Sequence, residues 1–364
     1  MKQISSRKNK RLLDNIITYG IVIAAFIIVQ LLEASGGLSS SLQGQLVPIC
    51  CYVVMAVSLN LVVGVSGELS LGHAGFMSVG AFTGVVASVA LADAIPSGPA
   101  RLLVCMIVGA LFAGVAGVVI GVPVLRLRGD YLAIVTLAFG EIIKNIINCL
   151  YIGVDSEGIH FSVESADKLG LAEGGVAVIK GPMGATGYAK LATFTAGFLL
   201  VLLTLAVVLN LVHSRAGRAI MALRDNRIAA ESVGIGATKY KLMAFVTSAV
   251  LAGAAGALYA MNYGTIAAKK FDFNTSILIL VFVVLGGMGS IRGSIIAAAL
   301  LTVLPEMLRA VGDYRMLIYA VVLIVVMIVT NNAAIRQFYA EKFGGTWTSP
   351  QSWSAVIWAS TSAV

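Results

Sequence analysis

The chain has 364 residues, of which 59% are apolar and 12% are charged, and its mean hydropathy is +0.96. Soluble domains carry about 25% charged residues, so this composition excludes a soluble globular enzyme, a disordered protein and a nucleic-acid-binding protein. The formal charge of +8 fits the basic loops that orient membrane proteins. The sequence therefore predicts a chain whose main solvent is the lipid bilayer.

Ten apolar stretches predict an all-α transmembrane bundle of about ten helices. The first follows five basic residues between Lys2 and Arg11, and it is longer than the ~7–15-residue hydrophobic region of a secretory signal. Basic residues are about twice as numerous in the segments predicted to be inside as in those predicted to be outside. This bias predicts that both termini lie in the cytoplasm. The stretches are approximately 16–32, 46–65, 69–92, 101–125, 131–151, 191–212, 242–263, 275–291, 293–311 and 314–331.

Two connections between these stretches are long, and they differ in charge. Residues 152–190 hold more acids than lysines and many glycines, which predicts an extracytoplasmic loop of irregular structure or short strands. Residues 213–241 are basic and form the predicted cytoplasmic loop. The transmembrane domain then covers residues 1–331, and residues 332–364 form a C-terminal tail with three tryptophans and no assigned function.

Small residues recur at a spacing of four in several stretches, for example at Gly80, Gly84 and Ser88 and again at Ser248, Ala252 and Gly256. This spacing places them on one helix face, where small side chains let two backbones approach closely in lipid. Plain helix packing is the favoured interpretation, ahead of an interface that moves during function.

Residues 64–75 form an unusual glycine-rich segment with a charged residue in an apolar region. Such a segment is tolerated where the backbone is buried in protein or lines a cavity, and a broken helix there offers free N–H and C=O groups to a substrate. A tight cytoplasmic turn with a solvated Glu68 is an equally good interpretation, and a lone buried histidine is more often a packed residue than a ligand. The candidate pathway residues are Gly67, Glu68, Ser70, Gly72 and His73.

A second glycine-rich segment, residues 284–293, interrupts two later apolar stretches. It adds Gly286, Gly287 and Gly289 to the candidate pathway, because interrupted helices in both halves of a chain indicate a central route. Glu141 and Lys144 lie three residues apart within another stretch. They share a helix face, and a self-neutralising pair is favoured over a contact with substrate.

The cytoplasmic loop contains a run of helix formers at 218–232, followed by a glycine where a helix would end. A short amphipathic helix here either lies on the lipid surface or docks a soluble partner. The residues considered for docking are Arg224, Asp225, Arg227, Ala229, Ala230, Glu231 and Gly234.

Several chemical motifs are missing from the sequence. No G-x-x-x-x-G-K-[ST] occurs, so the chain has no P-loop for ATP. The three histidines are scattered and the four cysteines form no CxxC pair, so neither a metal site nor a redox motif is supported. No group of residues forms a catalytic constellation, and the chain is expected to be no enzyme and to bind no cofactor itself.

Over residues 47–331 the sequence resembles the permease subunits of ATP-binding-cassette importers for branched-chain amino acids. Within that family it is similar to the longer of two paired permeases. The fragments that carry the resemblance are Ser58-Leu59-Asn60-Leu61, Leu69-Ser70-Leu71-Gly72-His73-Ala74, Leu127-Arg128-Gly129-Asp130-Tyr131, Ala138-Phe139-Gly140-Glu141, Arg224 to Gly234 and Leu285-Gly286-Gly287-Met288-Gly289-Ser290.

The resemblance implies a multi-pass permease in a prokaryotic cell membrane that moves leucine, isoleucine or valine inward by alternating access. It implies a second homologous permease, two cytoplasmic subunits that bind ATP and Mg²⁺, and an extracytoplasmic solute-binding protein. The cytoplasmic loop would be the coupling element, with Ala229, Ala230 and Gly234 at the spacing of that family's motif. Ile228 replaces the leading glutamate of the motif.

Other functions stay open at this stage. Relatives often have a Gly-Gly-Pro-Asn-Gly run where this chain has Val154-Asp155-Ser156-Glu157-Gly158, and relatives also transport urea, short amides or other amino acids. An ion-coupled secondary transporter would need buried carboxylates or histidines for ion coupling, and only Glu68 and Glu141 are available. A membrane-embedded enzyme would need polar groups clustered at one depth.

Overall fold

The computed structural model describes residues 2–36, 39–127, 129–155, 158–171, 175–308, 312 and 314–331. Arg128, Ser156, Glu157 and the tail with its three tryptophans lie outside the described residues. Backbone contacts divide the chain into Met1–Met307 and Leu308–Val364. In the second unit the main described element is helix α12 (Arg315–Asn331).

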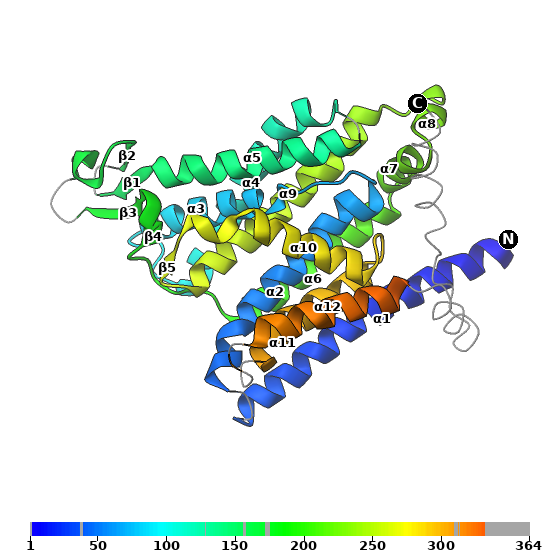
Figure 1. Ribbon diagram of the computed structural model, residues 1–364, viewed down its shortest axis with the longest axis horizontal. Coiled ribbons are helices and arrows are strands. Elements are labelled where there is room, and N and C mark those ends of the chain that lie inside the picture. Colours follow the sequence, from blue (N-terminus) through cyan, green and yellow to red (C-terminus); the bar gives the residue numbers. More distant parts are fainter. Residues whose placement is uncertain are drawn as a thin grey trace. The chain divides into compact units, whose positions relative to one another are not determined.

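All ten predicted apolar stretches are helical, which confirms the predicted all-α bundle (Figure 1). The predicted cytoplasmic loop supplies two further helices, α7 (Arg215–Asp225) and α8 (Arg227–Ser232), where the sequence predicted one. The other helices in the first unit are α1 (Lys2–Ala34), α2 (Ser40–Asn60), α3 (His73–Ala90), α4 (Gly98–Val124), α5 (Asp130–Cys149), α6 (Phe194–His213), α9 (Ala237–Asn262), α10 (Phe273–Gly286) and α11 (Ile291–Met307).

Within the described residues, seven helices are long and apolar enough to cross a membrane, so the chain is a multi-pass membrane protein. They differ strongly in burial. The window in α2 and the π-helix that continues it is 89% buried, whereas the window in α5 is 22% buried. Helices α3 and α9 are also largely buried. The core of the first unit is therefore built from α2, α3 and α9, while α1, α4, α5 and α6 present apolar faces outward.

The stripes of small residues are the contacts between the core helices, as predicted. A Cβ atom at Gly80 of α3 would overlap the backbone of Gly253 in α9, and a Cβ at Gly256 would overlap the carbonyl of Met77. Gly109 of α4 packs in the same way against Gly80 and Ala257. The backbones of α3, α4 and α9 thus meet almost directly, which gives dispersion contacts that larger side chains would prevent.

The predicted extracytoplasmic loop folds into a small antiparallel sheet in the order β2-β1-β3-β4-β5. Four of its strands are β1 (Tyr151–Val154), β2 (Ile159–Ser162), β3 (Val176–Lys180) and β4 (Ala185–Thr186). The fifth, β5 (Thr265–Ile266), follows α9, so the sheet fastens the loop to that helix. The buried Tyr188 hydroxyl donates to the Ala260 carbonyl at 3.1 Å, and burial raises the pKa of this phenol, which keeps it a donor.

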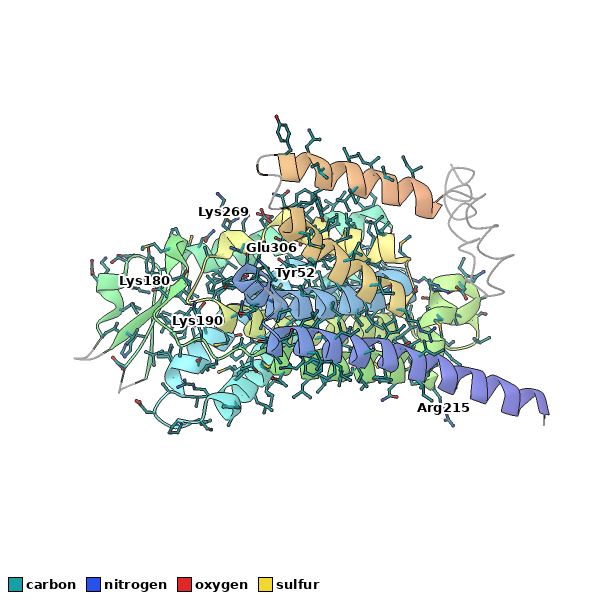
Figure 2. All side chains as sticks on the ribbon, turned by 90° about the horizontal axis from the view of Figure 1, so that it is seen from below. Tyr52, Lys180, Lys190, Arg215, Lys269 and Glu306 are labelled. Atoms are coloured by element: carbon teal, nitrogen blue, oxygen red, sulfur yellow. The ribbon has the colours of Figure 1, made fainter. Side chains whose placement is uncertain are left out.

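The two long connections lie at opposite ends of the first unit, as the predicted topology requires. Figure 1 shows the sheet at one end and α7 and α8 at the other. Figure 2 gives the same separation from a perpendicular direction, with Lys180 and Lys190 at the sheet end and Arg215 at the α7 end. The first unit therefore has a sheet end and an α7–α8 end, and the helices run between them.

The close contact between α3 and α9 gives the first prediction. Gly80→Ala should destabilise the protein by at least ~1–3 kcal/mol, because the new methyl group meets only backbone atoms that cannot rotate away. Gly20→Ala in α1 is the matched control, since nothing lies within 4 Å of its Cβ position. For both variants the unfolding temperature in detergent is measured with a thiol-reactive dye, which labels the three buried cysteines once the protein unfolds. Equal unfolding temperatures would contradict this packing.

Candidate functional site

The first glycine-rich segment begins as an extension of α2. The π-helix Leu61–Val65 continues α2, and the Ser66 amide donates to the Leu61 carbonyl at 3.1 Å. The chain then turns at Gly67, whose φ of 76° is unfavourable for any residue with a side chain. Residues 67–70 have no regular structure before α3 begins at His73. A short π-helix of this kind often marks a functional position, because it leaves backbone groups without regular helical partners.

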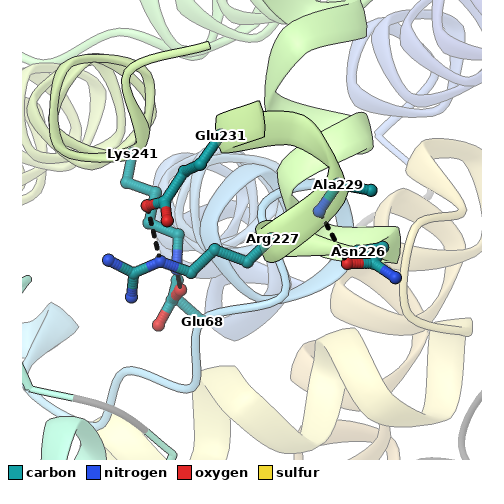
Figure 3. Close-up of polar contacts among 6 residues, drawn as sticks. All are labelled: Glu68, Asn226, Arg227, Ala229, Glu231 and Lys241. Atoms are coloured by element: carbon teal, nitrogen blue, oxygen red, sulfur yellow. Dashed lines mark hydrogen bonds and ion pairs between the residues drawn. The ribbon is translucent and has the colours of Figure 1, made fainter. Parts of the chain in front are cut away.

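Glu68 lies at the α7–α8 end of the bundle, where it forms an ion pair with Lys241 near the start of α9 (Figure 3). Each of the two side chains is only 12% exposed. The segment is therefore a turn at this end of the bundle, and the Glu68 carboxylate is paired rather than solvated. Pairing offsets part of the cost of holding either charge in this partly buried position.

Beyond Glu68 the segment runs back among the helices. The Leu71 amide donates to the Thr136 hydroxyl of α5 at 3.1 Å, and a Cβ atom at Gly72 would overlap the Thr136 carbonyl. The Ala74 amide donates to the Ser276 hydroxyl of α10 at 3.2 Å. The N-terminus of α3 therefore begins inside protein, and hydroxyl groups from neighbouring helices satisfy its free amides.

His73 and Ser70 are both buried, but they differ in hydrogen bonding. The Nε2 atom of His73 lies 2.8 Å from the Ser58 hydroxyl, and that hydroxyl donates to the Met55 carbonyl at 3.0 Å. The buried imidazole therefore has a hydrogen-bond partner in the Ser58 hydroxyl of α2. Ser70 is 1% exposed, and its hydroxyl has no hydrogen-bond partner among the described residues.

The second glycine-rich segment is the turn between α10 and α11. Gly287 and Gly289 have φ values of 90° and 84°, which only glycine adopts readily. Gly286 and Gly293 pack backbone against backbone, and a Cβ atom at either would overlap the other. A side chain larger than hydrogen at position 286 or 293 would therefore move α10 away from α11.

The structure brings the two glycine-rich segments into direct contact. The Asn60 side chain accepts from the Gly289 amide at 2.8 Å and donates to the Ser294 hydroxyl at 3.0 Å. A Cβ atom at Gly64 would overlap the Asn60 amide oxygen and the Gly289 nitrogen. Asn60 is fully buried, so both of its hydrogen bonds stabilise the join between α2 and the α10–α11 turn.

Helices α7 and α8 form a small unit with its own apolar cluster. Leu223 and Ala230 are buried there together with Ala237, the first residue of α9. Asn226 separates the two helices, and its side chain accepts from the Ala229 amide at 3.0 Å and so caps α8 (Figure 3). This cap explains why the predicted single helix is divided.

The sequence-predicted docking residues occupy different positions on this unit. Arg227 pairs with Glu231 at 2.9 Å on the surface (Figure 3), and Ala230 points into the apolar cluster. Gly234 has a φ of 85° and ends α8, as its position in the sequence predicts. The large apolar side chains of Ile228 and Val233 are 82% and 75% exposed, and nothing in the described chain covers them.

Arg224 connects this unit to the first glycine-rich segment. Its Nη1 atom donates to the Gly64 carbonyl at 2.9 Å, while its Nε and Nη2 atoms bond Asp225 at 3.1 Å and 2.9 Å.

Glu141 and Lys144 form the predicted ion pair, and Glu141 also accepts from the Phe273 amide at the start of α10, at 3.2 Å. Within the described residues, no three His, Cys, Asp or Glu side chains are grouped to hold a metal ion.

Four polar residues of this region were not among the candidate site residues predicted from the sequence. Asn60, Thr136 and Ser276 each bond a glycine-rich segment or the start of α3, and Lys241 neutralises Glu68. A signal existed for Asn60, because an amide within an apolar stretch is expensive unless it has a partner. Nothing in the sequence pairs Lys241 with Glu68.

Comparison with known proteins finds a family match over nearly the same residues as the resemblance. Residues 41–329 match the family described as branched-chain amino acid transport system / permease component. The chain is 37% identical over 287 residues to the high-affinity branched-chain amino acid transport system permease protein LivM of Salmonella typhimurium. That match covers 76% of this chain and 66% of the relative.

More distant relatives are also permeases. LivH of Salmonella typhimurium, a high-affinity branched-chain amino acid transport system permease protein, is 29% identical over 38% of this chain and 45% of its own length. The fructose import permease protein FruG of Bifidobacterium longum is 24% identical over 71% of this chain and 72% of its own. No solved structure matches the chain significantly.

The ion pair between Glu68 and Lys241 gives the second prediction. Glu68→Gln and Lys241→Met should each destabilise the protein, because each leaves a partly buried charge without its partner. The double variant should lose less than the sum, with a coupling energy of ~1–3 kcal/mol in the free energy of unfolding during an SDS titration. The exposed pair Arg227–Glu231 is the control, with an expected coupling of ~0.3–0.5 kcal/mol. Similar coupling energies for both pairs would refute the structural role of Glu68.

Proposed function

The chain belongs to the family of permease components of branched-chain amino acid transport systems, and we propose that it is one of two paired permease subunits of an ATP-binding-cassette importer. Its relatives LivM and LivH are permeases, which makes this chain a transport subunit by family. The observation that carries the rest of the proposal is the arrangement at the α7–α8 end. There, an exposed apolar surface is joined through Arg224 to a glycine-rich break among the membrane helices.

ATP would be bound and hydrolysed, with Mg²⁺, on two separate subunits that dock on α7 and α8. The sequence has no P-loop of its own, so the energy has to come from partner chains. Ile228 and Val233 are apolar, exposed and held on a rigid, capped helix pair, which is the form expected of a docking surface. In this proposal the α7–α8 end faces the cytoplasm, and the sheet end faces the solute-binding protein outside.

The second permease would pack against the exposed face of α5. In α4 the exposed positions from Leu103 to Val122 are all apolar, as a lipid-facing surface requires. The exposed face of α5 also carries the amide of Asn145, beside an apolar hollow of about 440 Å³. An amide is costly in lipid but readily bonded by another protein chain, so this face suits a protein neighbour better than lipid.

The proposed substrate is leucine, isoleucine or valine, taken up by alternating access around the glycine-rich segments. Packed helices switch between discrete arrangements more readily than they deform, and the two joined turns offer one place for such a switch. FruG, a fructose import permease by name, belongs among the relatives, so the same type of subunit serves other small solutes. Urea, short amides and other amino acids are the alternatives to test alongside leucine.

The third prediction concerns energy coupling. The permease purified with its partners and reconstituted in vesicles should take up leucine only with ATP inside and the binding protein outside. Collapsing the proton and sodium gradients should leave uptake unchanged, because the chain offers few buried carboxylates for ion coupling. Uptake that follows an ion gradient and ignores ATP would replace this proposal with a secondary transporter.

The fourth prediction concerns the docking surface. Ile228→Asp should reduce co-purification of the ATP-binding subunits at least tenfold, since it places a charge in the centre of the proposed contact. Phe161→Asp, at a side chain that is 67% exposed in β2 at the sheet end, is the matched control and should leave that co-purification unchanged. Full retention of the ATP-binding subunits by Ile228→Asp would remove the docking role of α8.

A further inference from the structure

Arg224 is placed to act on the membrane helices rather than on a partner. Its Nη1 atom donates to the carbonyl of Gly64, a residue 160 positions earlier in the chain. The aliphatic part of the side chain covers Gly67, where an added Cβ atom would lie 2.5 Å from Arg224 Cγ. One side chain of α7 therefore holds the first glycine-rich segment both by a hydrogen bond and by packing.

The bonded carbonyl lies at a sensitive place in the bundle. Gly64 belongs to the π-helix at the end of α2, where carbonyl groups lack regular helical partners. The same residue packs against Gly289, and the Asn60 side chain links its helix to the Gly289 amide at 2.8 Å. Movement of Gly64 therefore has to move the α10–α11 turn, or break a buried hydrogen bond.

The neighbouring acid fixes the direction of the guanidinium group. Asp225 accepts from Nε and Nη2 of Arg224, which leaves Nη1 directed at Gly64. This use of several donors in a fixed plane is specific to arginine, because a lysine ammonium is a single point charge on a flexible chain. A charge-conserving change at this position should therefore fail to replace it.

We propose that Arg224 is the positioning residue that fastens the first glycine-rich segment to α7, so that residues 61–72 follow α7 and α8 when these helices are displaced. The inference rests on the proposed function, because it assigns the displacement to ATP-driven movement of the docked subunits. It differs from a docking role, since Arg224 acts inward on Gly64 and Gly67 and is not required to hold the ATP-binding subunits.

The first test compares Arg224→Lys and Arg224→Met with Arg218→Met, in the complete complex. Arg218 lies on the same helix, but bonds only the nearby His213 carbonyl at 3.3 Å among the described contacts. Both Arg224 variants should retain the ATP-binding subunits, while leucine uptake per ATP hydrolysed falls at least tenfold, and the control should match the wild type. An unchanged ratio would overturn the inference, and so would loss of the ATP-binding subunits, because Arg224 would then act outward.

A cross-link tests the fastening itself, because a covalent bond then replaces the contact of Arg224 with Gly67. The Cβ position of Gly67 lies 3.4 Å from Arg224 Cβ, close to the ~3.5–4.5 Å of a disulfide. In a Cys149→Ser background, Gly67→Cys with Arg224→Cys should be uncoupled when reduced and should regain uptake when diamide joins the two thiols. If oxidation instead lowers uptake further, the segment and α7 have to separate during transport, and the inference fails.

The proposed function and the inference about Arg224 would fail in different ways. If the wild-type complex does not couple uptake to ATP, the proposed function is wrong and the variants need not be compared. If the wild type is coupled and the Arg224 variants or the oxidised cross-link behave against expectation, the proposed function stands and only the inference about Arg224 is lost.

Discussion

The contact between the backbones of Gly64 and Gly289 is the constraint on which the α7–α8 end of the bundle depends. No side chain larger than hydrogen fits at Gly64, because a Cβ atom there would overlap both Gly289 and the Asn60 amide. The contact joins the end of α2, the most buried of the helices long enough to span a membrane, to the turn between α10 and α11. The glycine-rich segments each weaken a helix, but together they are stable. The Asn60 side chain at the end of α2 supplies the acceptor that the Gly289 amide would otherwise lack.

Polar contacts extend outward from this join in several directions. Arg224 connects it to α7, the pair of Glu68 and Lys241 connects it to α9, and Arg292 donates to Thr18 of α1 at 2.6 Å. In an apolar bundle such bonds are few and directional, so they specify how these helices are placed against one another. Toward the sheet end, the helices instead meet through glycine and alanine faces, which hold their spacing without fixing a direction.

Much of the fold was predictable, because lipid restricts the choices available to the chain. Ten apolar stretches gave ten helices, and glycine spacing located the packed faces of α3 and α9. The composition of residues 64–75 and 284–293 located both turns. Their contact with each other was not predictable, because Asn60 and Gly289 are 229 positions apart and no local pattern pairs them. The division of α7 from α8 and the recruitment of β5 to the sheet depend on single caps and pairings that periodicity does not record.

The central claim is that the two glycine-rich segments form one joint that responds to events at α7 and α8. Hydrogen exchange of backbone amides in the intact reconstituted complex tests it most directly, with peptides covering residues 61–72 and 284–293 compared between the nucleotide-free and ATP-bound states. The account predicts that exchange changes in both segments together, while the sheet strands and the contact of α3 with α9 keep their protection. A change confined to one segment, or absent from both while transport proceeds, would contradict it.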